Sequence, residues 1–73
     1  MDREQVARNI LALLAYQFLS PADAARAFGV SKVFIGKALT PPFQKLSENQ
    51  VERFAEYLGT TSQKLTSGPI IRL

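Results

Sequence analysis

The chain contains no cysteine and no histidine among its 73 residues. Without cysteine it forms neither a disulfide nor a thiolate metal site, and without histidine it lacks the most common general base and metal ligand. It also has no phosphate-binding loop and no converging set of carboxylates. We therefore do not expect an enzyme, and we expect no cofactor, no metal site and no small-molecule substrate.

Long apolar runs are missing as well. The most apolar stretch, residues 10–19, is shorter than the ~20 residues that a membrane-spanning helix needs. Asp2 and Glu4 stand where a signal peptide would carry basic residues, and no small-residue cleavage site follows. We expect a cytoplasmic protein without a membrane partner.

Length and charge set the class of the protein. A chain of 73 residues makes one domain, and a domain of this size buries only roughly 60% of its unfolded surface. The hydrophobic fraction of 47% suits a compact all-helical core. The formal net charge of +3 is compatible with a nucleic-acid partner but does not establish one.

Apolar spacing and capping residues predict five helices. The first runs from residue 2 to 19 and starts with Asp2 as its cap. The second starts at the cap Ser20 and ends before Gly29, and the third runs from the cap Ser31 to Thr40, where two prolines stop it. The expected apolar stripe of the first helix consists of Val6, Ile10, Leu13, Leu14 and Phe18.

The fourth predicted helix has the clearest boundaries. Ser47 and Gln50 have the spacing of a capping box, and Gly59 ends the helix. Its apolar stripe is expected to consist of Val51, Phe54, Ala55 and Leu58. Thr60 is the expected cap of a short fifth helix that stops at Gly68. The chain therefore divides into a helical domain, 1–68, and an apolar tail, 69–73.

Residues 20–41 have the layout of a helix-turn-helix, in which two short helices meet at a tight turn. Gly29 tolerates the positive φ that the turn requires. Ala25 is small where the second helix must approach, and Ile35, Ala38 and Leu39 are apolar where that helix faces inward. The alternative interpretation is an ordinary helical hairpin in a small bundle.

With the following helix, glycine and short final helix, this segment resembles the lambda-repressor-like family of phage Cro and repressor DNA-binding domains. The resemblance extends from the first helix to Gly68. It implies an all-α, five-helix domain that binds a palindromic operator in double-stranded DNA as a homodimer and regulates transcription, with a recognition helix that begins at Ser31.

The resemblance also assigns roles to single residues. Phosphate contacts fall on the start of the second helix, and base contacts fall on the start of the third helix and one turn further along its outer face. Contacts with the DNA backbone also cluster in the segment after the third helix. The DNA-binding residues expected on this basis are Ser20, Pro21, Ser31, Lys32, Val33, Gly36, Lys37, Thr40 and Lys45. Family members often carry Gln at the position of Pro21, so that hydrogen bond is missing here.

The residues support this assignment in part. Lys32 and Lys37 suit phosphate or a guanine edge, and Val33 suits a thymine methyl group. A solvated pair of lysines beside an accidental glycine is the alternative interpretation. The third helix has no Gln, Asn or Arg, which are the side chains best suited to bidentate base recognition. A protein-interaction module on the same fold, such as an antirepressor, antitoxin or adaptor, is therefore the rival function.

Three other features have simpler explanations. Phe34 is expected to pack on Phe43 and the prolines, or else to serve an interface. Arg26 is expected to be a solvated charge. The row Glu48, Glu52 and Glu56 is read as a solvated face that points away from DNA, in preference to acid chemistry.

The apolar tail is unusual for a chain end, because free ends are normally polar. Its β-branched residues favour an extended strand that could pair with a second copy or cross the partner's last helix. The dimerisation residues expected on this basis are Ile70, Ile71 and Leu73. The alternative is that the tail folds back onto its own subunit, over the first helix.

Overall fold

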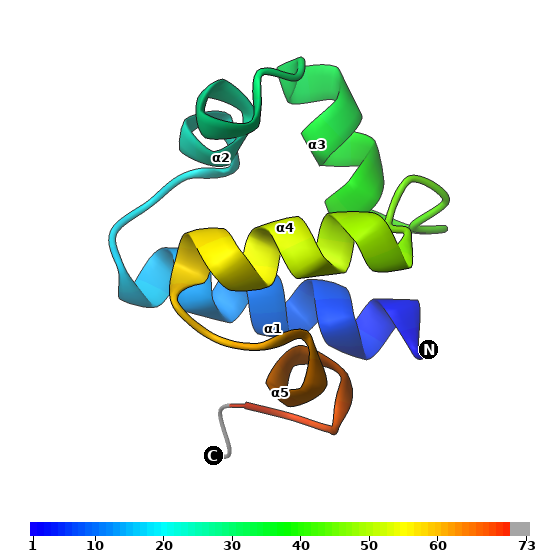
Figure 1. The fold of residues 1–73 in the computed structure, drawn as a ribbon. Coiled ribbons are helices and arrows are strands. Elements are labelled where there is room, and N and C mark those ends of the chain that lie inside the picture. The colour runs from blue at the N-terminus through cyan, green and yellow to red at the C-terminus, as the bar shows by residue number, and fades with distance from the viewer. Residues whose placement is uncertain (71–73) are drawn as a thin grey trace.

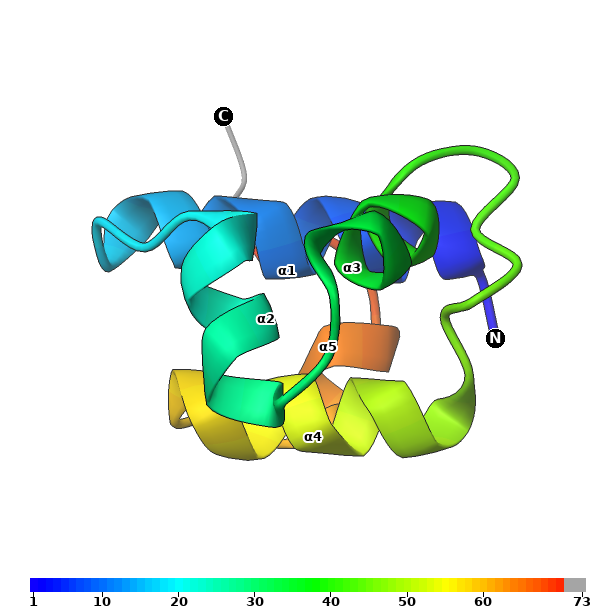
Figure 2. The same ribbon diagram turned by 90° about the horizontal axis from the view of Figure 1, so that it is seen from above.

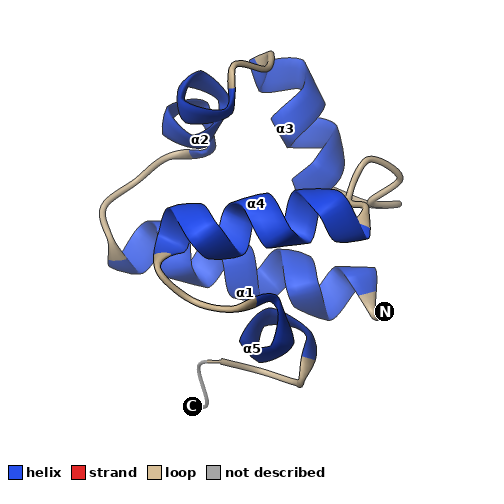
Figure 3. Ribbon diagram, in the orientation of Figure 1, coloured by secondary structure: helices blue, strands red, loops and turns tan. Residues whose placement is uncertain are grey.

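The computed structural model describes residues 1–70, and within this range the chain is all-helical, with loops between the helices and no strand (Figure 3). All five predicted helices are present. Their bounds are α1 (Arg3–Tyr16), α2 (Pro21–Phe28), α3 (Lys32–Leu39), α4 (Glu48–Leu58) and α5 (Ser62–Thr66) (Figure 1).

The helices form three layers. α1 and α4 run alongside each other in the same direction and make the middle layer (Figures 1 and 2). α2 and α3 pack together on one side of this layer, and α5 packs on the other side against both α1 and α4. One face of α3 therefore stays free of other helices.

A single apolar cluster holds the layers together. The predicted inward residues of α3 and α4 are all buried in it, and Leu46 from the loop between these helices joins them. Phe34 and Phe43 are partly buried and pack against the same cluster. At about 25 cal/mol per Å² of apolar surface, this burial is the main force that favours the folded chain.

Four of the five predicted helix caps are confirmed. The side chains of Asp2, Ser20, Ser31 and Ser47 each accept a hydrogen bond from the backbone N–H three residues on. The prediction of Thr60 as the fifth cap was wrong by one residue, because Thr61 accepts from the Lys64 N–H at 3.2 Å. α5 starts at Ser62, so Thr61 is the residue directly before it, whereas the Thr60 N–H still belongs to the end of α4 and donates to Ala55 at 2.9 Å.

The predicted capping box of α4 is only half formed. The Ser47 hydroxyl accepts from the Gln50 N–H at 3.3 Å, but the Ser47 N–H donates to the Lys45 carbonyl and not to the Gln50 side chain. The reciprocal box occurs instead at α2, between Ser20 and Asp23.

The prediction that Phe18 belongs to the apolar stripe of α1 was wrong. α1 ends at Tyr16, and Phe18 follows it with a φ of +58° and 97% of its surface exposed. The Phe18 N–H donates to Ala15 and the Leu19 N–H donates to Leu14. These two bonds end the helix in the usual way, and they turn the phenyl ring away from the core.

Asn9 was not singled out in the sequence, yet it is the buried polar residue of the core, only 3% exposed. Its amide group donates at 2.9 Å to the carbonyls of Leu65 and Gly68. Its oxygen accepts from the Gln5 side chain and from the Ile70 N–H. Asn9 therefore ties α1 to α5 and to the start of the tail.

The turn between α2 and α3 has the predicted geometry. Gly29 has a φ of +70°, and the Val30 N–H donates at 3.0 Å to the carbonyl of Ala25. Ala25 is buried with Ile35 and Ala38 in the core.

No helix within residues 1–70 is long and apolar enough to cross a membrane.

We expect replacement of Ala25 by Leu to lower the thermal midpoint clearly. Overpacking a core site costs about 1–3 kcal/mol, and each kcal/mol corresponds to roughly 4–8 °C in a domain of this size. Ala27→Leu is the matched control, because Ala27 lies on the same helix and is exposed. Thermal unfolding followed by circular dichroism measures both. Equal midpoints for the two variants would show that Ala25 does not limit how closely α2 and α3 approach.

Candidate nucleic-acid interface

The free face of α3 is formed by residues spaced one helical turn apart. Ile35, Ala38 and Leu39 are buried against α1 and α2. Lys32, Val33 and Lys37 are exposed on the opposite face, and Val33 keeps 66% of its surface. Two cations and one aliphatic side chain therefore stand together on the face of α3 that no other helix covers.

Gly36 lies in the middle of this face. A Cβ atom built at Gly36 meets no atom within 4 Å, so packing within the chain does not require a glycine there. A glycine in a helix costs roughly 1 kcal/mol relative to alanine. Its presence at an open position is consistent with the close approach of another molecule.

The loop after α3 extends the basic face. Lys37 and Lys45 line one hollow of ≈ 430 Å³, whose other lining residues are Thr40, Pro41, Pro42 and Gln44. The fold thus brings Lys45 next to α3, although it lies eight residues beyond Lys37. Gln44 was not among the predicted contacts, and its amide is the one bidentate group that lines this hollow.

The start of α2 is less suited to phosphate than predicted. The Asp23 carboxylate accepts from the Ser20 N–H at 2.7 Å and from the Ser20 hydroxyl at 3.0 Å. These bonds, the backbone one first, hold the pKa of Asp23 below its usual range. Arg26 pairs with the same carboxylate, and Pro21 has no N–H. Ser20 and Pro21 therefore offer no free hydrogen-bond donor to a phosphate, and the negative charge of Asp23 lies beside them.

Two further hydroxyl groups of the predicted site are engaged within the chain. Ser31 accepts from the Phe34 N–H at 3.1 Å and caps α3, which leaves its own hydrogen available. Thr40 donates at 2.6 Å to the Gly36 carbonyl. The exposed ammonium groups of Lys32, Lys37 and Lys45 are therefore the main donors of this face.

Charge is unevenly distributed along the chain, a feature that the single motifs do not reveal. Residues 29–47 contain three basic residues and no acidic one, whereas the rest of the chain has six basic and six acidic residues. The positive net charge thus comes from the segment that carries α3 and its two flanking turns. Clustered basic residues provide the electrostatic attraction that nucleic-acid binding needs.

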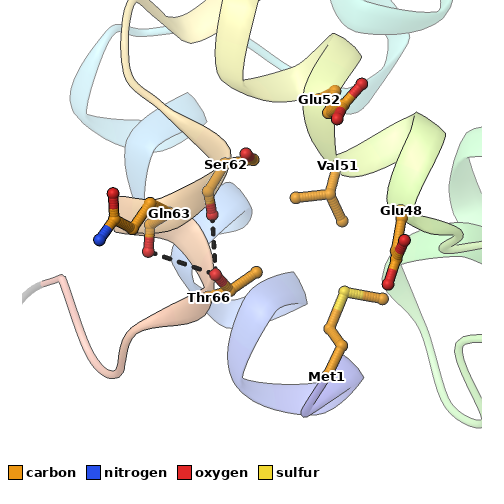
Figure 4. A pocket seen from close by; sticks show the side chains of 7 residues that line it. All are labelled: Met1, Glu48, Val51, Glu52, Ser62, Gln63 and Thr66. Atoms are coloured by element: carbon orange, nitrogen blue, oxygen red, sulfur yellow. Dashed lines mark hydrogen bonds between the residues drawn. The ribbon is translucent and has the colours of Figure 1, made fainter.

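The acidic residues of α4 lie elsewhere. Glu48, Glu52 and Glu56 are all exposed, as predicted. Glu48 and Glu52 border a hollow of ≈ 440 Å³ between α4 and α5 (Figure 4), but their carboxylates point in different directions. The hydroxyl of Thr66 in this hollow donates to backbone carbonyls of its own helix. Among residues 1–70, no group of three potential metal ligands comes together.

The tail starts on its own subunit. Ile70 is partly buried against the core, and its N–H donates at 3.1 Å to Asn9. For this residue the structure matches the alternative in which the tail folds over the first helix. Ile71 and Leu73, the other predicted dimerisation residues, lie outside the described residues.

No family model, no curated protein and no solved structure matches the chain.

Proposed function

We propose that this protein is a sequence-specific DNA-binding regulator of transcription, with a lambda-repressor-like fold and α3 as its recognition helix. It binds a palindromic operator as a homodimer. The observation that carries the proposal is the free face of α3, where Lys32, Val33 and Lys37 surround the open Gly36. An α-helix fits the major groove of DNA, and a helix without bulk at its centre can approach the bases closely.

Affinity and specificity have different sources in this proposal. Lys32, Lys37 and Lys45 supply the electrostatic affinity for phosphate. Val33 contacts a thymine methyl group, and Gln44 beside Lys45 is placed to read a base edge or bind the backbone. With few bidentate side chains, sequence preference depends on DNA shape and on the spacing of two half-sites.

A protein-interaction module is the second candidate, and one observation favours it. The most exposed apolar residue of α3 is Val33, on a helix with no Gln, Asn or Arg. A protein partner would cover this residue equally well. Because one fold serves many functions, binding has to be measured.

Selection of fragments from a random DNA pool by the purified protein tests the proposal directly. We expect enrichment of a palindromic consensus, and binding that weakens steeply as salt is added. If no sequence is enriched and duplex DNA is not bound at low salt, the DNA-binding function is wrong and the protein-interaction function takes its place.

Replacement of Gly36 by Glu should abolish DNA binding and leave the fold intact. The position is open, and glutamate favours a helix over glycine, so the thermal midpoint should stay equal or rise. The new carboxylate would face phosphate and base edges that repel it. A gel-shift assay and circular dichroism measure the two effects separately.

Gly36→Gln is the matched control, because it adds nearly the same bulk without the charge. We expect it to bind DNA more weakly than the native protein and more tightly than Gly36→Glu. If folded Gly36→Glu binds as the native protein does, α3 is not the helix that contacts DNA.

A further inference from the structure

Phe18 follows the end of α1, and its aromatic side chain makes no contribution to the core. α2 and α4 end with Gly29 and Gly59 in the left-handed region, at φ values of +70° and +74°. Phe18 occupies the corresponding position after α1 at +58°. The pattern of backbone hydrogen bonds is the same in all three cases. Bulky residues are rare in this conformation, and the ring gains no packing, since 97% of Phe18 is exposed.

α1 also carries other exposed apolar residues in its last two turns before Phe18. Leu11 and Tyr16 keep 39% and 77% of their surface, and Ala15 is also exposed. At 100° per residue, these three side chains fall within an arc of about 140° on one side of the helix. We call Leu11, Ala15, Tyr16 and Phe18 the α1 terminal patch.

The patch is free of charge. Residues 9–22 contain no acidic or basic residue, in a chain whose formal net charge is +3. Two copies of a positively charged protein repel each other over most of their surface, and this repulsion is weakest where both surfaces are neutral. A charged partner would gain no attraction here. A second copy of the chain is the partner that suits a neutral apolar patch, because a two-fold interface places the same patch on both sides.

The position of the patch also suits a dimer that binds DNA. The connection between α1 and α2 lies at the lateral end of the molecule, to the left in Figures 1 and 2, whereas α3 lies on the upper layer. A two-fold axis beside this end leaves both copies of α3 on the same side.

We propose that the α1 terminal patch is the homodimer interface of this protein, with Phe18 and Tyr16 of each copy packed against α1 of the other. This interface rests on the proposed function in one respect, namely that the homodimer is two-fold symmetric. It differs from the predicted tail contact, of which the structure describes only Ile70, whose N–H donates to Asn9 of its own subunit.

Phe18→Gly tests this assignment, because glycine removes the ring and favours the local backbone conformation. In sedimentation equilibrium without DNA, the full-length native chain should shift from 8.1 kDa toward twice that mass as concentration rises. Phe18→Gly should stay a monomer over the same range, and its thermal midpoint, measured at a concentration where both proteins are monomers, should be equal or higher. A residue with a purely structural role would lower the midpoint instead. Tyr16→Ser should also weaken the dimer.

Two controls complete the experiment. Val33→Ser removes an exposed apolar side chain from α3, and it should leave the monomer–dimer equilibrium unchanged. The double variant Ile71→Ser, Leu73→Ser changes the end of the tail and should also dimerise as the native chain does. The proposal is overturned if the native chain is a monomer at every concentration, if Phe18→Gly dimerises normally, or if only the tail variant loses the dimer.

The outcome is separable from that of the proposed function. A dimer that Phe18→Gly abolishes, in a protein that does not bind duplex DNA, supports the interface and contradicts the DNA-binding function. A protein that stays a monomer and still selects a DNA sequence contradicts the interface and supports the DNA-binding function.

Discussion

Replacement of Asn9 by Asp should remove a large part of the stability of this domain at neutral pH. In place of the amide donor, a carboxylate oxygen would face the carbonyls of Leu65 and Gly68, which the native side chain contacts at 2.9 Å. Each buried polar group left unsatisfied costs about 1–3 kcal/mol, and a charged group costs more. The whole free energy of unfolding of a 73-residue chain is only about 4–11 kcal/mol.

The measurement is the thermal midpoint followed by circular dichroism. We expect it to fall by at least about 10 °C, since 1 kcal/mol corresponds to roughly 4–8 °C in a small domain. The matched control is Asn49→Asp, which makes the same substitution at an exposed position in the first turn of α4. Asn49→Asp should change the midpoint little, because an acidic residue is favourable near a helix N-terminus.

The effect of Asn9→Asp should also depend on pH. Burial raises the pKa of a carboxyl group above its unfolded value of about 3.9. The protonated form is then favoured in the folded state, so stability is retained below the unfolded pKa and lost as pH rises through the folded pKa. The deficit relative to the native protein should therefore shrink as pH falls from 7 toward 4. Equal midpoints for Asn9→Asp and Asn49→Asp would show that the link from α1 to α5 and the tail does not hold the fold.

Removal of three lysines from the free face of α3 and its following loop should have the largest effect on binding. We expect Lys32→Gln, Lys37→Gln, Lys45→Gln to lower affinity for a mixed-sequence DNA duplex by roughly two to three orders of magnitude near 0.1 M salt. Each lost phosphate contact removes about 0.9 from the slope of log affinity against log salt, so the slope should fall by about 2.7 for three contacts. Fluorescence anisotropy over a salt series measures both quantities.

The control removes the same charge from the rest of the surface. Arg8→Gln, Arg53→Gln, Lys64→Gln takes the formal net charge from +3 to zero, as the first triple variant does. Arg8 and Arg53 make weak contacts, to Glu4 at 4.0 Å and over the Phe28 ring, so a thermal melt of both variants monitors folding. If the two variants lose affinity and slope equally, net charge alone drives binding and the face of α3 has no special role.

Much of the local structure was predictable from short-range chemistry. Ser20, Ser31 and Ser47 stand directly before α2, α3 and α4, and each side chain bonds a backbone N–H within the next turn. Gly29 ends α2 for an equally local reason, because it accepts a positive φ. Such interactions join residues at most a few positions apart, so residue type and spacing are enough to locate them.

The candidate site was predictable only in part. The spacing of Ile35, Ala38 and Leu39 placed Lys32, Val33 and Lys37 correctly on the opposite, exposed face. The occupation of the Ser20 donors by Asp23 was not foreseen, although both residues were identified at the start of α2. The spacing of Ser20 and Asp23 is itself that of a capping box, and the structure forms this box, with Arg26 on the other carboxylate oxygen.

The sequence by itself determined five helices, four of their five N-terminal caps and the inward faces of α3 and α4, because these follow from periodicity and from bonds between near neighbours. The tertiary structure alone decided the roles of Asn9 and Phe18. Periodicity defines the faces of a helix relative to its own axis, but it does not show which face another helix covers. Asn9 is satisfied by carbonyls 56 and 59 residues away. Phe18 is exposed because α1 ends at Tyr16 and the chain turns toward α2 through the positive φ of Phe18.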